Sequence, residues 1–367
     1  MKPKTHSTDE LAGLVQQIHR WGQELGFQQV GITGTSLQEA ENHLEHWLNR
    51  NHHGEMEYMS RHGLKRSRPD ELVSGTTRII SVRMDYLPHK ARTAVDQLGK
   101  NDRAYISRYA LGRDYHKLIR ARLQKLVQRI EAELQGFNYR VFTDSAPVLE
   151  KALAEKAGIG WIGKHSNLIN HAAGSWFFLG EIYTDLPLPV DSAAEEHCGS
   201  CQACIEICPT QAIIAPYQVD ARLCISYLTI EYKGVIEEKL RTMLGNRIYG
   251  CDDCQLCCPW NRFGKLSKET DFQPRHGLDD SALLDLFSWS ESEFMKNMEG
   301  SPIRRIGYQN WQRNISIALG NAAYDPNIVK ALEKKQISAS ELVREHISWA
   351  IRQQTNRACY QRTSIDL

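Results

Sequence analysis

Hydrophobic residues near the start of the chain recur at the spacing of one helical face. Leu11, Leu14, Ile18 and Leu25 follow this period, which predicts an amphipathic helix. The same patterns predict helices over residues 8–26, 36–50, 114–135 and 147–157, and strands over residues 29–33, 77–84, 139–143 and 175–184. Helices that alternate with strands in this way indicate an α/β or α+β domain covering residues 1–190.

The pattern changes after residue 190. Pro187 and Pro189 punctuate a linker, and all the cysteines but one then fall between residues 198 and 258. After about residue 265, hydrophobic residues again recur at helical spacing, in segments short enough for paired helices. Such pairs are compatible with one or two HEAT-like repeats. We therefore expect three domains, over residues 1–190, 191–265 and 266–367.

Composition and charge narrow the class of protein. With 41% hydrophobic and 24% charged residues, the chain has the composition of a soluble globular protein. No apolar run approaches the roughly 18 residues that cross a bilayer, and no apolar signal core is found near the start. We expect a cytoplasmic protein, where clustered cysteines more often bind metal than form disulfides. Lys and Arg outnumber Asp and Glu in residues 61–120 and 301–367, which suits a polyanionic partner or simply a solvated surface.

The first cysteine group has the spacing of an iron–sulfur protein. Cys198, Cys201, Cys204 and Cys208-Pro209 form a complete C-x2-C-x2-C-x3-C-P run. In ferredoxins with two clusters, the first three cysteines of such a run bind one [4Fe–4S] cluster and the fourth binds the other. Structural zinc, the alternative, usually pairs two C-x2-C knuckles or combines cysteine with histidine. The run therefore predicts two [4Fe–4S] clusters.

A second cysteine group supplies the remaining ligands. It consists of Cys251, Cys254, Cys257 and Cys258-Pro259. By analogy with the first run, Cys258 should cross over and complete cluster 1, whose ligands are then Cys198, Cys201, Cys204 and Cys258. Cluster 2 has Cys208, Cys251 and Cys254, and its fourth ligand is either Cys257 or Cys224. We prefer Cys224, because adjacent side chains such as those of residues 257 and 258 rarely reach two separate clusters without strain.

Several segments resemble the epoxyqueuosine reductase family. They are Phe142-Thr-Asp-Ser-Ala-Pro-Val-Leu-Glu150, Ala157-Gly-Ile-Gly-Trp-Ile-Gly-Lys164, Arg222-Leu-Cys-Ile-Ser-Tyr-Leu-Thr229 and Gly245-Asn-Arg-Ile-Tyr-Gly-Cys251. The similarity covers nearly the whole chain. It implies an α+β fold with a nitroreductase-like cobalamin-binding domain (1–190), a bacterial-type two-cluster ferredoxin domain (191–265) and a HEAT-like helical tRNA-binding domain (266–367). In this family the cysteine that corresponds to Cys224 binds the second cluster.

The resemblance also implies an activity and its partners. Enzymes of this family reduce epoxyqueuosine to queuosine at the wobble position of tRNA, the last step of queuosine biosynthesis, with a cobalamin that the two clusters recharge. The implied partners are tRNA that carries epoxyqueuosine in its anticodon and an electron donor such as a flavodoxin or ferredoxin. We expect a monomer that does not bind a membrane.

The resemblance assigns roles to individual residues as well. Asp144 corresponds to the proton donor; because it precedes the helix predicted from residue 147, a helix N-cap is the structural alternative. The implied cobalamin contacts are Arg66, Asp144, Leu168, Leu179, Ile182 and Ser226. A solvated loop charge is the alternative for Arg66, and core packing is the alternative for the three apolar residues. The candidates for phosphate contact with RNA are Lys233 and Arg247. The positive charge after residue 300, with Arg304, Arg305 and Arg313 close to Trp311, predicts that the helical tail also binds RNA.

Two other functions are compatible with the cysteine pattern. A soluble reductive dehalogenase-like enzyme would share the cobalamin and the clusters, although that class usually carries an export signal. A ferredoxin-type electron-transfer module would hold the clusters without a catalytic centre, and it would bind no corrinoid and have no need of Asp144.

Overall fold

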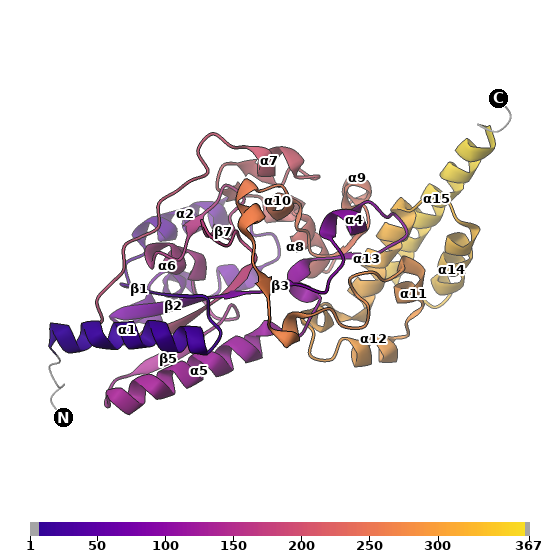
Figure 1. The fold of residues 1–367 in the computed structure, drawn as a ribbon. Helices are drawn as coiled ribbons and strands as arrows, with labels where there is room; N and C mark the ends of the chain where they lie inside the picture. Colours follow the sequence, from indigo (N-terminus) through magenta and orange to yellow (C-terminus); the bar gives the residue numbers. More distant parts are fainter. Residues whose placement is uncertain (1–6, 364–367) are drawn as a thin grey trace.

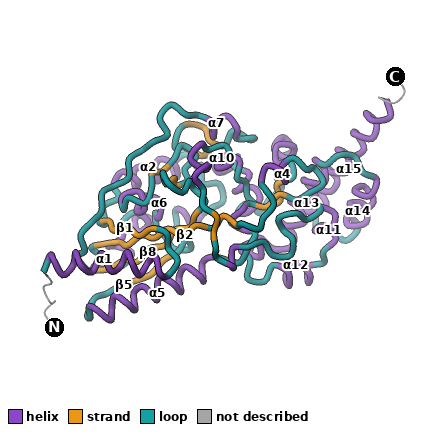
Figure 2. The backbone as a smooth tube through the Cα atoms, in the orientation of Figure 1, coloured by secondary structure: helices purple, strands orange, loops and turns teal. Residues whose placement is uncertain are grey.

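A four-stranded antiparallel sheet organises the N-terminal half of this computed structural model, which describes residues 7–363 (Figure 1). Its strands, in spatial order, are β1 (Gln29–Thr33), β2 (Arg78–Asp85), β8 (Phe177–Thr184) and β5 (Tyr139–Phe142). They lie side by side as orange segments in Figure 2. All four coincide with predicted strands, and the mixed α/β class is confirmed.

Helices cover both faces of this sheet. One face carries α1 (Thr8–Glu24) and α5 (Tyr115–Glu133), and the other carries α6 (Glu150–Lys156). The side chains of β8 alternate between these layers: Phe178 and Ile182 pack with α1 and α5, whereas Leu179 and Tyr183 pack on the side of α6. Gly180 permits the close approach of α5, because a Cβ at this position would lie 2.9 Å from the Ile119 side chain.

The helix predicted over residues 147–157 begins later than expected. It starts at Glu150, and its N-cap residue, Leu149, makes no side-chain capping bond. Asp144 therefore lies in the preceding loop, too far from the helix to cap it, and the N-cap interpretation of Asp144 is wrong. Its backbone adopts a left-handed conformation, with φ of 51°, which Asp tolerates better than most residues.

The remaining elements include the longest helix of the C-terminal region, α15 (Glu341–Thr363), and several short helices and strand pairs. The helices are α2 (Gln38–Asn49), α3 (Pro69–Leu72), α4 (Ala94–Leu98), α7 (Ala203–Ile207), α8 (Ile225–Ile230), α9 (Glu238–Arg241), α10 (Asp253–Leu256), α11 (Leu283–Ser288), α12 (Glu291–Asn297), α13 (Gly307–Asn321), α14 (Pro326–Gln336) and α15 (Glu341–Thr363). The two-stranded pairings are β3 (Leu87–Pro88) with β12 (Leu266–Ser267), β4 (Tyr105–Ile106) with β11 (Arg247–Tyr249), β6 (Trp161–Ile162) with β7 (Leu168–Ile169), and β9 (Ile213–Ala215) with β10 (Gln218–Val219).

One hydrophobic core joins all three predicted domains. It contains residues from 104–111, from 221–249 and from 278–350. Helix α13 lies at its centre and packs against α15, and α14 packs against α15 in turn. The predicted boundaries near residues 190 and 265 thus cross a shared core, and the HEAT-like character of the last helices stays a prediction.

Two side chains predicted to contact RNA belong to this core. Trp311 is fully buried and stacks on Trp289. The fully buried guanidinium of Arg313 donates hydrogen bonds to the carbonyl oxygens of Tyr232 and Gly234, each at 2.9 Å, and of Leu228 at 2.7 Å. Neither side chain can reach RNA in this structure, so this part of the prediction is wrong.

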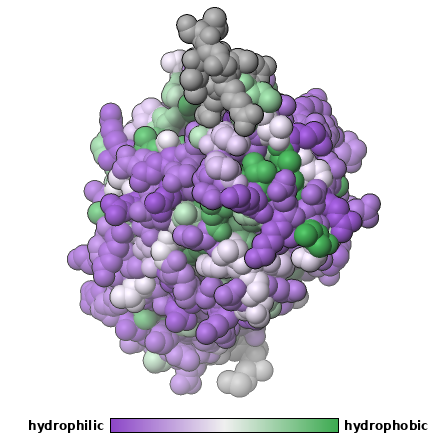
Figure 3. Space-filling view, turned by 90° about the vertical axis from the view of Figure 1, so that its right-hand side faces the viewer, coloured by the Kyte–Doolittle hydropathy of each residue, from purple (hydrophilic) through white to green (hydrophobic). Residues whose placement is uncertain are grey.

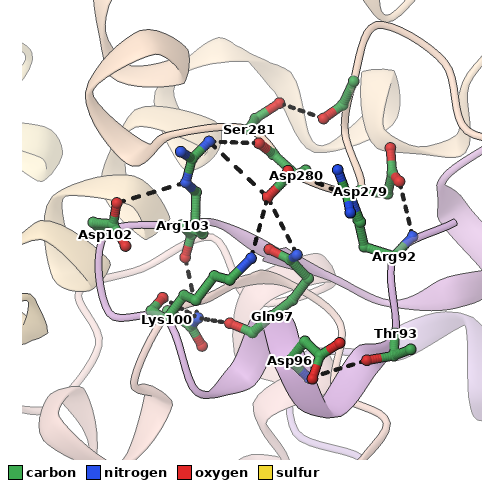
Figure 4. Close-up of polar contacts among 12 residues, drawn as sticks. Arg92, Thr93, Asp96, Gln97, Lys100, Asp102, Arg103, Asp279, Asp280 and Ser281 are labelled. Atoms are coloured by element: carbon green, nitrogen blue, oxygen red, sulfur yellow. Dashed lines mark hydrogen bonds and ion pairs between the residues drawn. The ribbon is translucent and has the colours of Figure 1, made fainter.

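A polar cluster also fastens the α4 segment to the C-terminal region (Figure 4). Asp280 accepts a hydrogen bond from Gln97 at 3.2 Å and lies 3.6 Å from the Arg92 guanidinium and 3.8 Å from Lys100 Nζ. Because these ion pairs are partly exposed, each contributes little on its own. Their common effect is to fix the segment between β3 and β4 against the C-terminal helices.

The C-terminal end of the molecule presents a mostly hydrophilic surface with scattered hydrophobic residues (Figure 3). Ile337, 84% exposed, is the most exposed of the large hydrophobic residues that the structure describes. Among residues 7–363, no helix combines the length and hydropathy required to cross a membrane.

Candidate active site

A cavity of about 470 Å³ lies where the sheet domain, the cysteine-rich segment and the C-terminal helices meet. Apolar side chains of β7 and β8 form part of its wall: Leu168, Phe177 and Leu179. Ser226 of α8 lines it as well. Arg305, from the short 3-10 helix η8 (Pro302–Ile306), brings a basic group to the same cavity. The cavity therefore has apolar surface together with a few polar and charged groups, as ligand sites usually do.

Four thiols line this same cavity. They are Cys208, Cys224, Cys251 and Cys254. The loop that bears the last two is anchored by Asp252, whose carboxylate accepts hydrogen bonds from the hydroxyls of Tyr105 at 2.7 Å and Ser107 at 2.6 Å. Asp252 is itself buried, so these hydrogen bonds lie in the protein interior. Cysteines distant in sequence are thus held at one wall.

A second cavity, of about 250 Å³, collects the other predicted ligands. Cys198, Cys201, Cys204 and Cys258 all line it. Lys164, which is buried, extends its Nζ toward this loop and donates to the carbonyl oxygens of Gly199 at 2.6 Å and Cys201 at 3.0 Å. The ammonium therefore fixes the first C-x2-C turn and places a positive charge beside the thiols.

Cys257 lines neither of these two cavities. Its thiol lies 3.5 Å from the carbonyl oxygen of Cys254, and the residue contributes instead to a cleft shared with Leu87 and Pro88. Cys224, by contrast, stands directly before α8 and lines the first cavity. The arrangement of the thiols favours Cys224 over Cys257 as the fourth member of the second group.

Asp144 projects into the first cavity and is held by two neighbours on α5. The Tyr115 hydroxyl donates a hydrogen bond to Asp144 Oδ2, and His116 Nε2 lies 3.3 Å from the same oxygen. His116 Nδ1 in turn lies 2.5 Å from Asp114 Oδ1. Tyr115 is fixed by stacking on Phe178, with ring centroids 3.8 Å apart. The result is a chain of titratable groups, Asp114–His116–Asp144, that ends at the cavity.

The electrostatics of this chain decide where its proton lies. Burial disfavours the charged imidazolium, but hydrogen bonds to Asp114 and Asp144 outweigh it and raise the pKa of His116 to about 9. Burial opposes ionisation of Asp144, yet hydrogen bonds from His116 and Tyr115 outweigh it and lower the pKa of that carboxyl. At neutral pH the pair is an imidazolium beside a carboxylate, so the transferable proton resides on His116.

Glu150, at the start of α6, adds a second carboxyl to the cavity wall. Burial, followed by the negative charge of Asp144, raises its pKa to about 7. Lys151 also lines the cavity, and burial lowers the pKa of its ammonium group. The cavity therefore contains several groups that can exchange protons near neutral pH.

Some predicted contacts lie elsewhere. Ile182 is fully buried between the sheet and α5, on the face of β8 opposite to Leu179, and it does not line the cavity. Arg66 is also absent from the lining; its Nη2 donates to the Tyr58 carbonyl oxygen at 2.6 Å. Arg247 is paired with Asp253 at 2.5 Å, which leaves its charge less available to a phosphate.

Sequence reasoning missed several residues of this cavity. Tyr115, Glu150 and Arg305 line it, and His116 contacts Asp144 beside it, but none of the four had been assigned to this site. A signal was present for two of them, since Asp114-Tyr-His116 places three polar or titratable side chains at the start of a strongly predicted helix. No sequence signal links Arg305 to Asp144, because the two are brought together only by the fold.

Comparison with known proteins now identifies the family. Residues 66–145 match the family described as epoxyqueuosine reductase QueG, DUF1730, and residues 197–261 match a 4Fe-4S double cluster binding domain. An epoxyqueuosine reductase from Pseudomonas aeruginosa is 58% identical over 94% of this chain and 96% of its own length. The chain belongs to the epoxyqueuosine reductase family. It is accordingly an oxidoreductase with a domain that binds two [4Fe–4S] clusters.

Further epoxyqueuosine reductases agree in sequence and in fold. The Escherichia coli enzyme is 58% identical over 95% of this chain and 91% of its own length. A crystal structure of an epoxyqueuosine reductase with an epoxyqueuosine-modified tRNA-Tyr stem loop superposes with a TM-score of 0.84 and 25% identity, covering 94% of this chain and 91% of that one. The architecture described above is therefore that of the family.

Proposed function

We propose that this enzyme reduces epoxyqueuosine to queuosine at the wobble position of tRNA, as the last step of queuosine biosynthesis. The observation that carries the proposal is that Asp144, which contacts His116, lines the same cavity as four thiols. A proton source and a site for an electron carrier thus border one space. Membership of the epoxyqueuosine reductase family supports the same substrate.

The two groups of thiols suit two [4Fe–4S] clusters. We assign Cys198, Cys201, Cys204 and Cys258 to cluster 1, and Cys208, Cys224, Cys251 and Cys254 to cluster 2. The first run supplies three ligands to one cluster and its last cysteine to the other, as in bacterial ferredoxins. The proposed ligands of cluster 2 line the first cavity, whereas Cys201 of cluster 1 is exposed at the surface. Electrons from a flavodoxin or ferredoxin would therefore enter at cluster 1 and leave through cluster 2.

The first cavity has the chemistry expected of a corrinoid site. Its apolar wall of Leu168, Phe177 and Leu179 suits the face of a macrocycle, and Ser226 lies on α8 next to cluster 2. A cobalamin bound there would supply electrons of low potential to the epoxide. The residues of this chain would orient the nucleoside, exclude water and supply the protons. A soluble reductive dehalogenase would also use such a site, but the family match favours the tRNA substrate.

Proton delivery falls to the groups around Asp144. Reduction of the epoxide breaks both C–O bonds, forms an alkene and releases water, and it consumes two electrons and two protons. The developing alkoxide is strongly basic and needs a general acid within hydrogen-bond reach. Asp144 faces the cavity and can receive the His116 proton and pass it to the oxygen. Asp114 keeps His116 protonated beforehand by its short hydrogen bond.

Basic residues at the cavity suit an RNA substrate. Arg305 is exposed and lines the cavity, and its neighbour Arg304 is exposed as well. Guanidinium groups bind phosphate in a bidentate manner, so this pair would hold the anticodon backbone at the cavity. Lys233 is exposed too and remains a candidate for the same role. We further propose that the enzyme is a cytoplasmic monomer.

The test is an anaerobic assay on tRNA that contains epoxyqueuosine. The protein with reconstituted clusters is mixed with a chemical reductant, with and without cobalamin, and the nucleosides are analysed by mass spectrometry. We expect queuosine only when cobalamin is present. Binding of cobalamin without formation of queuosine, together with dehalogenation of a halogenated phenol, would instead identify a reductive dehalogenase. No binding of cobalamin would identify an electron-transfer module.

A further inference from the structure

A carboxyl group without a partner is buried next to the candidate active site. Glu181, in the middle of β8, has no exposed surface, and neither of its carboxyl oxygens has a hydrogen-bond partner among the residues that the structure describes. Ser81 lies directly opposite on β2, and its hydroxyl is also buried without a partner. Buried polar groups are nearly always satisfied, so such a pair in the centre of a sheet requires an explanation.

The location of Glu181 connects it with Asp144. Glu181 and the cavity residue Leu179 lie two positions apart on β8 and therefore share a face of the sheet. On the neighbouring strand, Glu181 pairs with Phe142, which ends β5 two residues before Asp144. Glu150, at the cavity wall, interacts electrostatically with both Glu181 and Asp144. Three carboxyl groups from three elements thus gather behind one side of the cavity.

Burial determines the protonation state of Glu181. An ionised carboxylate without a partner in the protein interior costs several kcal/mol, so the group retains its proton instead. The charges of Glu150 and Asp144 act in the same direction, and the pKa of Glu181 lies well above its usual value. Three charged or titratable groups face Glu150: Asp144, Lys151 and His116. Burial has a larger effect on the pKa of Glu150 than any of these groups.

The reaction requires more protons than the Asp144–His116 pair supplies at once. The inference rests on the proposed function, in which two electrons from the low-potential reductant and two protons convert the epoxide into an alkene and water. His116 provides one proton through Asp144. Once RNA covers the cavity, the second proton must come from the protein.

We propose that Glu181 and Glu150 form a buried proton store that supplies the second proton of epoxide reduction. After Asp144 has given up the first proton, Glu150 transfers its own proton to Asp144, and the Glu181 proton replaces it. Asp144 then protonates the hydroxide equivalent, which leaves as water. After product release, solvent reloads the store through the open cavity. Glu150 and Glu181 act through Asp144 and are positioning and relay residues, whereas Asp144 alone contacts the substrate oxygen.

A spectroscopic experiment tests the stored proton without any substrate. Infrared spectra of the enzyme with reconstituted clusters are recorded across neutral pH, and the carbonyl stretch of a protonated carboxyl is sought. We expect this band in the parent, and Glu181→Gln should lose the part of the band that persists above the pKa of Glu150, about 7. The matched control is Glu155→Gln on α6, whose carboxylate accepts a hydrogen bond from the Ile162 amide at 2.7 Å and which does not line the cavity; this variant should keep the band. Absence of the band from the parent at neutral pH would overturn the proposal, whether or not the variants fold.

Kinetics test the use of the proton. Glu181→Gln should lower kcat for epoxyqueuosine tRNA by at least about tenfold, which is less than the roughly 10²–10⁴-fold expected for loss of the acid itself. KM for the tRNA should not change, and the solvent isotope effect on kcat should increase. Parental kcat and isotope effect in Glu181→Gln would refute the relay. If the parent itself produces no queuosine, the proposed function fails, while the infrared result still decides whether the buried proton exists.

Discussion

Replacing Asp144 by Asn tests whether the loop carboxylate is the group that hands protons to the substrate. Asn has nearly the same volume and tolerates the left-handed backbone at this position. Its amide oxygen can still accept the Tyr115 hydrogen bond, so the cavity should keep its shape. The substitution removes the charge next to His116 and the ability to transfer a proton.

Two magnitudes follow from the contacts of Asp144. Loss of a general acid slows a reaction by about 10²–10⁴-fold, which corresponds to roughly 3–5 kcal/mol in the barrier. The neighbouring imidazolium also loses one of its two carboxylate partners, each of which typically shifts a pKa by about 1–3 units. The pKa of His116 should therefore fall from about 9 by at least about one unit, while Asp114, still at 2.5 Å, keeps it partly raised.

Both magnitudes can be measured on the same protein. Turnover of epoxyqueuosine tRNA gives kcat, and titration of the 15N-labelled imidazole by NMR gives the pKa of His116. Asp70→Asn, at an exposed carboxylate outside the cavity, serves as the control and should leave both values unchanged. Parental turnover by Asp144→Asn, or an unchanged pKa of His116, would show that the pair does not work as described.

Four other outcomes are expected from the structure. Cys224→Ala should reduce bound iron from about eight to about four atoms per chain, whereas Cys257→Ala should retain both clusters. If iron analysis gives the reverse, Cys257 and not Cys224 is the fourth ligand of cluster 2. Arg305→Gln should weaken tRNA binding and reduce the salt slope by about one, as measured by mobility shift, unless the guanidinium makes no phosphate contact. Arg313→Met should lower the free energy of unfolding in urea by at least about 1–3 kcal/mol, because the carbonyl oxygens of Leu228, Tyr232 and Gly234 lose their donor; a loss below about 1 kcal/mol would contradict this. Burial lowers the pKa of His346 to about 4, so this imidazole binds a proton more readily in the unfolded state. The free energy of unfolding should therefore fall as the pH decreases from 6.5 toward about 4. His346→Gln should flatten this dependence in urea titrations at several pH values.

Local patterns predicted the secondary structure well where they were periodic. The strand of residues 175–184 and the helix of residues 114–135 both appear in place, because their apolar faces are long enough to specify the period. The alternation of β8 also contained information that was not used. Since Leu179 and Ile182 differ by an odd number of positions, they point to opposite faces of the sheet, and only one of them can border the cavity.

The site was only partly predictable, for reasons that are physical. The cysteines could be grouped because iron–sulfur ligands obey fixed local spacings. Trp311 and Arg313 were misjudged because composition cannot show that a guanidinium will find three backbone carbonyls in the interior. Glu181 looks like any other charged residue in the sequence, and only the sheet register shows that it has no access to water.

The walls of the first cavity come from residues as far apart as Tyr86 and Arg305, and one hydrophobic core joins all three parts of the chain. No fragment that ends near residue 265 retains this enclosure, because α13 would be missing from the centre of the core. The proposed corrinoid should consequently find its complete site only after the whole chain has been synthesised and folded. In this way the architecture acts as a checkpoint, since an incomplete chain would lack part of the walls that surround the proposed cofactor.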